Sequence, residues 1–267
     1  MREMTQTTCI GFSRHTPEMP TPAEMMSVYK TLEAMMRRLG AAPNWFSAWD
    51  GIGRGGYKKF SGAFHKKVLE REMVGYQGLG FAAAPVDSKA PGYDSFVTAG
   101  FTFMPGIGMI DVTLVAHEPY LQCGSVTCDN IVAELARLWQ WDYGFGFARD
   151  AATAPDVYLD GAGSNLHSAE DERRTDLWYE SSHDFYKGVE PPRRLFMVRD
   201  IFPYNMVGPE HLAHRLPDGR SLREFIDGDA GSDLRPLADN LWLWKVKPDR
   251  TEAIRDKLRG TGVIIAE

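Results

Sequence analysis

Hydrophobic residues recur at helical spacing through residues 21–40, TPAEMMSVYKTLEAMMRRLG. Thr21 is followed three residues later by Glu24, which matches a capping box, and Pro22 suits a first helical turn. Gly40 ends the pattern. The spacing therefore predicts an amphipathic helix, whose apolar face is formed by Met25, Val28, Leu32, Met35, Met36 and Leu39.

The same pattern analysis predicts the remaining elements. Helices are predicted where a polar or acidic cap precedes apolar residues at helical spacing, in 61–73, 128–141, 168–188, 221–228 and 249–260. Strands are predicted for the apolar or alternating runs 7–15, 78–86, 94–104, 108–117, 142–150, 193–202, 240–246 and 261–267. The segment 42–49, APNWFSAW, matches a buried strand poorly because polar residues interrupt it.

The order of these elements predicts an α+β fold. Strands and helices are mixed without regular βα alternation, and neighbouring strands such as 94–104 and 108–117 are joined by a short hairpin connection. We expect antiparallel sheets with helices packed on one face, in a single domain over residues 1–267. The alternative is two similar halves, 1–150 and 168–267, joined by the loop 152–167, although no sequence repeat supports it.

Composition is that of an ordinary globular protein, with 43% hydrophobic and 25% charged residues. No run approaches the roughly 18 apolar residues of a membrane span, and the N-terminus lacks the apolar stretch of a secretory signal. The three cysteines, Cys9, Cys123 and Cys128, argue against a disulfide framework and fit a reducing compartment. We therefore expect a cytoplasmic protein with no membrane partner.

Charge is segregated along the chain, which carries a net charge of −6. Residues 1–75 hold eleven basic against seven acidic side chains, including the cluster Arg54, Lys58, Lys59, Lys66, Lys67 and Arg71. The middle of the chain is acidic, with Asp150, Asp156, Asp160, Glu170, Asp171, Glu172 and Asp176 against Arg173 and Arg174. Either cluster could steer an oppositely charged partner, or could simply be a solvated surface.

Gly51, Gly53 and Gly56 stand at the G-x-G-x-x-G spacing of a phosphate-binding loop. Such a loop needs a buried parallel strand before the glycines and a helix directly after them. The preceding segment 42–49 does not supply that strand. The sequence therefore favours a flexible basic loop over a nucleotide site.

Candidate catalytic residues are few. Asp142 and Asp150 flank an aromatic strand, where they could act as paired carboxylates or simply mark its ends. His211 and His214 lack the i, i+4 spacing of a zinc protease, so a surface helix end is favoured there. Neither a metal nor a cofactor is predicted. An enzyme that uses Asp142, Asp150 or His211 stays an alternative, and it would show strongly shifted pKa values in a concave site.

Aromatic residues alternate through two segments, 139–147 and 241–246. The first set is Trp139, Trp141, Tyr143, Phe145 and Phe147, and the second is Trp242 and Trp244. Residues at alternate positions of a strand share a face, so each set would form a stripe. A stripe of this kind is either part of the core or an exposed anchor for a protein partner.

The C-terminal third resembles a known group of proteins. The segments VRDIFPYNMVGPEHLAHRLPDGRSLREFI and DNLWLWKVKPDR, with WDYGFGF before them, resemble immunity proteins encoded beside bacterial antibacterial toxins, including those of type VI secretion. The resemblance lies mainly in residues 139–150 and 194–250. It implies a non-catalytic cytoplasmic protein that binds a cognate toxin and blocks its active site.

The acidic segment 156–176 is the surface that we expect to contact such a toxin. An acidic surface would complement a basic nuclease cleft and speed encounter. The expected contacts are Asp156, Asp160, Glu170, Asp171, Glu172 and Asp176. The second alternative is a phosphate or nucleic-acid binding module that uses the basic cluster 54–71, but the sequence pI of about 5.7 disfavours it. The oligomeric state is left open.

Overall fold

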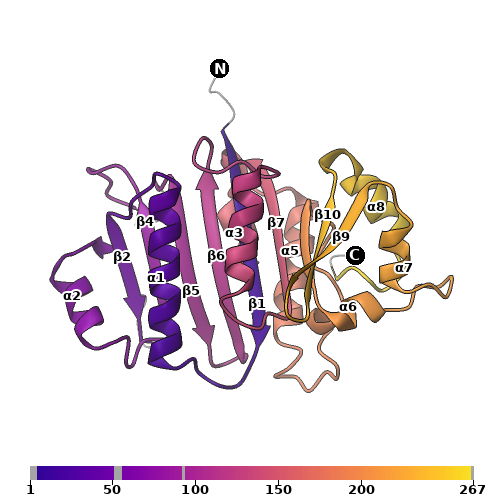
Figure 1. The fold of residues 1–267 in the computed structure, drawn as a ribbon, viewed down its shortest axis with the longest axis horizontal. Helices are drawn as coiled ribbons and strands as arrows, with labels where there is room; N and C mark the ends of the chain where they lie inside the picture. The colour runs from indigo at the N-terminus through magenta and orange to yellow at the C-terminus, as the bar shows by residue number, and fades with distance from the viewer. Residues whose placement is uncertain (1–4, 51–55, 92–93, 266–267) are drawn as a thin grey trace.

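A single ten-stranded sheet runs through the computed structural model, which describes residues 5–50, 56–91 and 94–265 (Figure 1). Its strand order is β3-β2-β4-β5-β6-β1-β7-β8-β10-β9, and neighbouring strands pair antiparallel. The strands are β1 (Gln6–His15), β2 (Trp45–Trp49), β3 (Lys58–Lys59), β4 (Gly78–Ala83), β5 (Val97–Met104), β6 (Met109–His117), β7 (Tyr143–Asp150), β8 (Tyr204–Val207), β9 (Ser232–Ala238) and β10 (Leu241–Val246).

Helices pack on both faces of this sheet, and the α+β class is confirmed. The α-helices are α1 (Pro22–Arg38), α2 (Ala63–Glu70), α3 (Val126–Ala136), α4 (Pro155–Leu159), α5 (Ala169–Ser182), α6 (Pro209–Ala213), α7 (Leu222–Asp227) and α8 (Thr251–Leu258). Three short 3₁₀ turns accompany them: η1 (Ala151–Thr153), η2 (Arg193–Leu195) and η3 (Pro248–Arg250). Among the described helices, none is both long and apolar enough to cross a bilayer.

The first face carries α1 and α3, which lie in front of the sheet in Figure 1. Helix α1 begins with the predicted capping box, in which the Thr21 hydroxyl accepts the Glu24 N–H and the Glu24 carboxylate accepts the Thr21 N–H. Met25, Leu32 and Met35 of its apolar stripe are buried against the sheet. Burial of this stripe is what fixes α1 across the strands.

The second face carries the other large core, which is confined to the C-terminal half of the sheet. Tyr143, Phe147 and Trp244 point into it, and buried apolar residues of α5 to α8 cover them. The helices of the first and second halves therefore lie on opposite faces. The prediction that helices share one face holds within each half and is wrong for the whole sheet.

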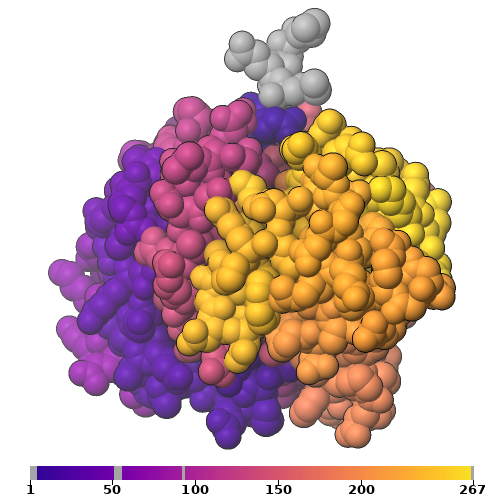
Figure 2. All heavy atoms as spheres, turned by 45° about the vertical axis from the view of Figure 1, so that its right-hand side comes forward, coloured from indigo at the N-terminus to yellow at the C-terminus, as the bar shows by residue number. Residues whose placement is uncertain are grey.

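The sheet crosses the position of the predicted loop without a break. Strand β7, before residues 152–167, pairs with β8, which follows them. The loop itself contains most of η1 and the whole of α4. In the space-filling view, the orange and yellow C-terminal part lies directly against the pink middle of the chain (Figure 2).

Two predicted strands are absent from the described residues. Residues 193–202 form η2 and bends, and 261–265 form turns; an isolated bridge between Val198 and Ile264 is what joins them. The prediction failed because Arg194 and Arg199 are not strand side chains facing solvent. Both are buried, and their guanidinium groups bond to helix carbonyl groups instead.

The aromatic segment 42–49 was rejected as a strand, and this interpretation is wrong. Residues 45–49 form β2, which pairs with β3 and β4. Phe46 and Ala48 enter the first core, and Ser47 lies on the other face. The polar interruption therefore marks a strand with one face outside the core, not a loop.

Other boundaries also differ. Strands β8 and β9 were not predicted, and the helix predicted over 61–73 is confined to Ala63–Glu70. The helix predicted over 249–260 begins at Thr251, and no side chain caps it, so the acidic cap expected at the start of this segment is wrong. The aromatic stripe divides at β7, because Trp141 belongs to the first core and Tyr143 to the second.

Candidate functional site on the open face of the sheet

Half of the second face has no helix over it among the residues that the structure describes. Strands β2, β4, β5 and β6 here present small or polar side chains, which include Ser47, Gly80, Thr98, Gly100, Thr102, Asp111 and Thr113. Together with α4, α5 and η2 they enclose a concavity of about 470 Å³. We call this surface the open face. Its volume falls in the range of ligand pockets, roughly 300–1,000 Å³.

Three glycines leave the sheet surface of the open face without side chains at Gly78, Gly80 and Gly100. The ring of Trp49 lies across Gly78, where an added Cβ would meet ring atoms at 2.0 Å. The Tyr57 hydroxyl lies over Gly80, 3.2 Å from the position of a Cβ. A side chain at Gly100 would meet only ordinary contacts, from 3.5 Å outward. The sheet surface is therefore uncovered at Gly100, whereas aromatic rings cover it at Gly78 and Gly80.

Helix α4 forms one wall of the concavity and stands on β1. The Leu159 side chain approaches Gly11 so closely that an added Cβ would lie 3.0 Å from it. Buried Arg199 fixes the end of this helix, because its guanidinium donates to the carbonyl oxygens of Tyr158 and Leu159 at 2.6 and 3.0 Å. Burial lowers the pKa of Arg199. Together these contacts hold Asp156 and Asp160 on the wall.

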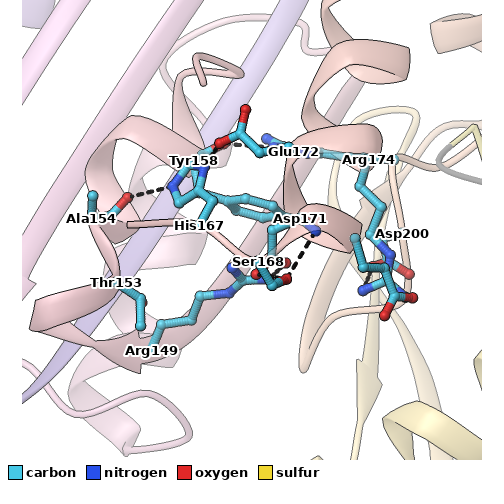
Figure 3. A network of polar contacts seen from close by, with 12 residues as sticks. Arg149, Thr153, Ala154, Tyr158, His167, Ser168, Asp171, Glu172, Arg174 and Asp200 are labelled. Carbon is cyan, nitrogen blue, oxygen red and sulfur yellow. Dashed lines mark hydrogen bonds and ion pairs between the residues drawn. The ribbon is translucent and has the colours of Figure 1, made fainter. Parts of the chain in front are cut away.

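The segment between α4 and α5 is tied down by a polar network (Figure 3). Glu172 accepts the Ser164 N–H at 2.7 Å and lies 3.0 Å from Nδ1 of His167. The other ring nitrogen of His167 donates to the Ala154 carbonyl oxygen at 3.2 Å. Asp171 receives a hydrogen bond from Arg149 at 2.8 Å. The acidic start of α5 therefore fixes the segment that carries α4.

Arg194 supports the second wall. Its guanidinium lies 3.6 Å from the centroid of the Trp178 ring and donates to the Trp178 carbonyl oxygen at 2.6 Å. It also donates to the Ser181 hydroxyl and contacts the Met109 sulfur, both at 3.0 Å. Burial lowers the pKa of Arg194 to about 9, although Asp111 opposes that shift.

Three carboxyl groups face the concavity from two elements: Asp111 from β6, and Asp156 and Asp160 from α4. Burial raises the pKa of Asp111 to about 6, against the opposing charges of Arg194 and His15. Asp160 is open to the solvent in the concavity, yet the surrounding protein raises its pKa to about 7. The carboxylates of Asp111 and Asp156 add to that shift, and Arg199 opposes it.

The predicted toxin contacts divide into two groups. Asp156 and Asp160 line the open face. Three others are engaged within the chain: Glu170 with Arg174, Asp171 with Arg149, and Glu172 with the His167 segment. Asp176 is exposed on α5. Asp111 was missed, although the alternating pattern of residues 109–117 places it on the polar side of a strand.

The residues considered for catalysis are each engaged within the fold, although the charge of Asp142 acts on His211 and opposes the lowering of its pKa. Asp142 accepts the backbone N–H of His15 at 2.7 Å, and Asp150 caps η1 through the N–H of Ala152. His211 is fully buried, so the expectation of a surface helix end is wrong. Burial lowers its pKa to about 4, and its Nδ1 accepts the Gly208 N–H.

No metal-binding group of three or more His, Cys, Asp or Glu side chains occurs in the described part of the chain. The three cysteines are free, with Cys9 and Cys128 buried. The described side chains of the basic cluster, Lys58, Lys59, Lys66, Lys67 and Arg71, are exposed.

The described residues on either side of the glycine motif include no parallel strand. Gly51, Gly53 and Arg54 lie outside the described residues. Strand β2, which precedes them, pairs antiparallel with both of its neighbours, and α2 begins only at Ala63. A phosphate-binding loop needs a parallel strand before it and a helix directly after it, and the described residues on either side of the motif supply neither.

Comparison with known proteins identifies a similar fold. No protein-family model and no curated protein matches the chain. The chain is similar to the structure described as Pseudomonas aeruginosa T6SS protein PA0821, with a TM-score of 0.59 and 7% identity over 97% of this chain and 73% of that one. This similarity shows a shared fold.

A weaker similarity is to the structure of the toxic C-terminal tip of CdiA from Pseudomonas aeruginosa in complex with immune protein. There the TM-score is 0.30 with 13% identity, over 55% of this chain and 89% of that chain. A score of this size carries no structural argument.

Proposed function

We propose that this protein is an immunity protein, which binds a cognate antibacterial toxin and occludes the toxin's active site. The observation that carries the proposal is the open face, a concave half of a sheet surface that no described helix covers. Large uncovered sheet surfaces with aromatic rims are typical of binding surfaces. The fold shared with a T6SS protein and the resemblance of residues 194–250 support the same class.

The toxin docks on the open face in this proposal, and Asp156 and Asp160 contact it directly. Glu170, Asp171 and Glu172 contribute by holding α4 and α5 in place, since each already has a partner in the chain. Asp176 is exposed on α5 and has no partner within the described residues that would keep it from contacting the toxin. Carboxylates at the centre would steer a basic toxin surface toward the concavity and raise the association rate.

One observation favours an enzyme as the second candidate. The raised pKa values of Asp111 and Asp160 lie in a concave site, which is the mark expected of a catalytic pair of carboxyl groups. The two functions differ in what Asp160→Asn does. It would abolish turnover by an enzyme, whereas an immunity protein would still protect cells, with a slower association.

The test is capture followed by protection. The tagged protein is expressed in the bacterium that carries its gene, and a stoichiometric partner is identified by mass spectrometry. That partner is then produced in a second bacterial host with and without this protein. Growth restored by co-expression supports the proposal, and a partner that stays toxic in its presence contradicts it.

A further inference from the structure

We propose that the open face binds a basic side chain, an arginine or a lysine carried on a convex loop of the partner, in the recess between β6 and α4. This inference rests on the proposed function for its biological setting. It names the chemistry of the partner, which the proposed function leaves undefined.

The charges on the two sides of the recess support a cationic occupant. The side-chain carboxylates of Asp111, Asp156 and Asp160 accept no hydrogen bond and form no ion pair within the described ranges, although the backbones of all three are part of β6 or of α4 and its C-terminal cap. Carboxylates elsewhere in the fold have their own cations; Asp184 is paired with Arg193 and Asp200 with Arg255. A cation of the partner could therefore form ion pairs with the three carboxylates in the concavity.

The cations nearest to these carboxylates are already engaged. Arg194 faces Asp111, but its donors are directed to Trp178, Ser181 and Met109. Arg199 faces Asp160, and two of its donors are bound to carbonyl oxygens of α4. His15 faces Asp111 from β1 and is 3.6 Å from Asp142. An external cation would thus meet carboxylates with free acceptor oxygens.

The shape of the concavity limits the size of the occupant. About 470 Å³ accepts one or two side chains and not a helix or a domain. The floor residues Thr98 and Gly100 are small, and the exposed ring of Tyr179 lines the concavity. Aromatic rings stabilise a guanidinium or ammonium group and also pack against its aliphatic stem.

An apolar rim continues from this recess along the end of α5. Tyr179 lines the concavity and is 58% exposed, and Phe185 and Tyr186 beyond it are 50% and 76% exposed. Phe185 lies close to Gly108, beside Ile107 of the lining. Exposed aromatic residues next to a charged pocket are typical of interface hot spots, so the partner loop should have an apolar flank beside its basic tip.

The experiment titrates the purified protein with N-acetyl-arginine methylamide and follows backbone amide signals by NMR at pH 7.5. The matched probe is N-acetyl-citrulline methylamide, which has the same shape without the charge. We expect saturable shifts at Thr98, Asp111 and Thr113 with the arginine probe and none with citrulline. Asp111→Asn with Asp160→Asn should weaken binding at least about tenfold, while the exposed control Asp227→Asn should not change it.

Equal binding of the two probes, or full binding by the Asp111→Asn, Asp160→Asn variant, would overturn the inference. Asparagine keeps the shape of aspartate and removes a desolvated charge, so this variant should fold, and its amide spectrum shows whether it does. The outcome is separable from the proposed function. Arginine could bind here although no toxin is captured, and a toxin could be neutralised by a variant that binds no arginine.

Discussion

The second face of the sheet is built in two ways that meet at β1. Over β7, β8 and β10 it carries large aromatic side chains such as Tyr143, Phe147 and Trp244, and helices cover them. Over β4, β5 and β6 it carries glycine, threonine and aspartate, and no described helix lies above. One continuous sheet thus uses half of this face as core and leaves the other half without a described helix above it.

The difference shows what the side chains of each half contribute to the fold. In the covered half, bulky residues bury apolar area, which is the main stabilising contribution to the fold. In the open half, small residues on the free side cost little because the opposite side of the same strands is fully packed; Phe101 and Leu114 are both completely buried there. In β5 and β6, the side that stabilises the fold is therefore opposite to the side that we propose for binding.

The largest effect is expected from truncation in the covered half. Phe147→Ala removes a ring that is 2% exposed and packs against Phe145 and Phe202. We expect a loss of about 3–5 kcal/mol in the free energy of unfolding. Thr113→Ala in the open half should cost under about 1 kcal/mol. Urea denaturation measures both, and equal losses would show that the open half is core as well.

Charge reversal in the open half comes second. Asp156→Lys with Asp160→Lys should reduce the association rate with the captured toxin by about 10- to 100-fold at low ionic strength, because steering by these carboxylates is lost. Stopped-flow mixing measures the rate. The control is Asp227→Lys with Asp249→Lys, two exposed positions in the C-terminal part with the same change in net charge. Unchanged kinetics in the first variant would remove α4 from the interface.

Acidity should affect the Asp184–Arg193 pair and the open face in opposite directions. Hydrogen bonds from Arg193 lower the pKa of Asp184, so its contribution to stability is present above the unfolded value and is lost as the pH falls. The pKa of Asp160 is raised to about 7 in the folded protein. Between about pH 4 and pH 7 the Asp160 carboxyl group therefore ionises more readily in the unfolded chain, so the free energy of unfolding declines as the pH rises through this range.

Replacement by asparagine separates these two contributions. Asp184→Asn should cost about 1–3 kcal/mol at pH 7, because it weakens hydrogen bonds from Arg193 to a buried group. Asp160→Asn should instead raise stability at pH 8 and leave it nearly unchanged at pH 4. Urea midpoints at the two pH values measure both variants. A loss of stability in Asp160→Asn at pH 8 would contradict the raised pKa.

The smallest effect is expected at the floor of the concavity. Gly100→Ala adds a Cβ that meets only ordinary contacts, at 3.5 and 3.6 Å. It should raise the free energy of unfolding by about 0.4–1 kcal/mol, because alanine has fewer backbone conformations than glycine in the unfolded chain and so loses less entropy on folding. Thermal unfolding tests this value. A clear loss of stability would mean that the floor is packed more tightly than the concavity implies.

Local chemistry made much of the fold predictable from the sequence. The capping boxes at Thr21 and Ser221 and the alternation in 97–104 are determined by neighbouring residues, and each predicted its element. The buried arginines in 193–202 gave the opposite result. Their partners are carbonyl groups up to 41 positions away, and no local pattern indicates them.

The candidate site was predictable only in part. Asp156 and Asp160 of α4 were identified from the density of acidic residues, but Asp111 lies in strand β6, and only the pairing of β1 with β6 and β7 brings the three carboxyl groups to one concavity. The alternation in residues 97–104 and 109–117 did contain information about the open face. Threonine, glycine and aspartate on one side of two neighbouring strands indicate a sheet face that is not core.

The most direct test of the open face as the docking surface is a capture experiment with two tryptophan variants. Thr98→Trp fills the concavity from its floor, and Val126→Trp adds the same ring at an exposed position of α3, which packs on the first face and is 77% exposed. Both should fold as the wild type does. We predict that Val126→Trp captures the toxin and that Thr98→Trp does not; equal capture by both would contradict docking on the open face.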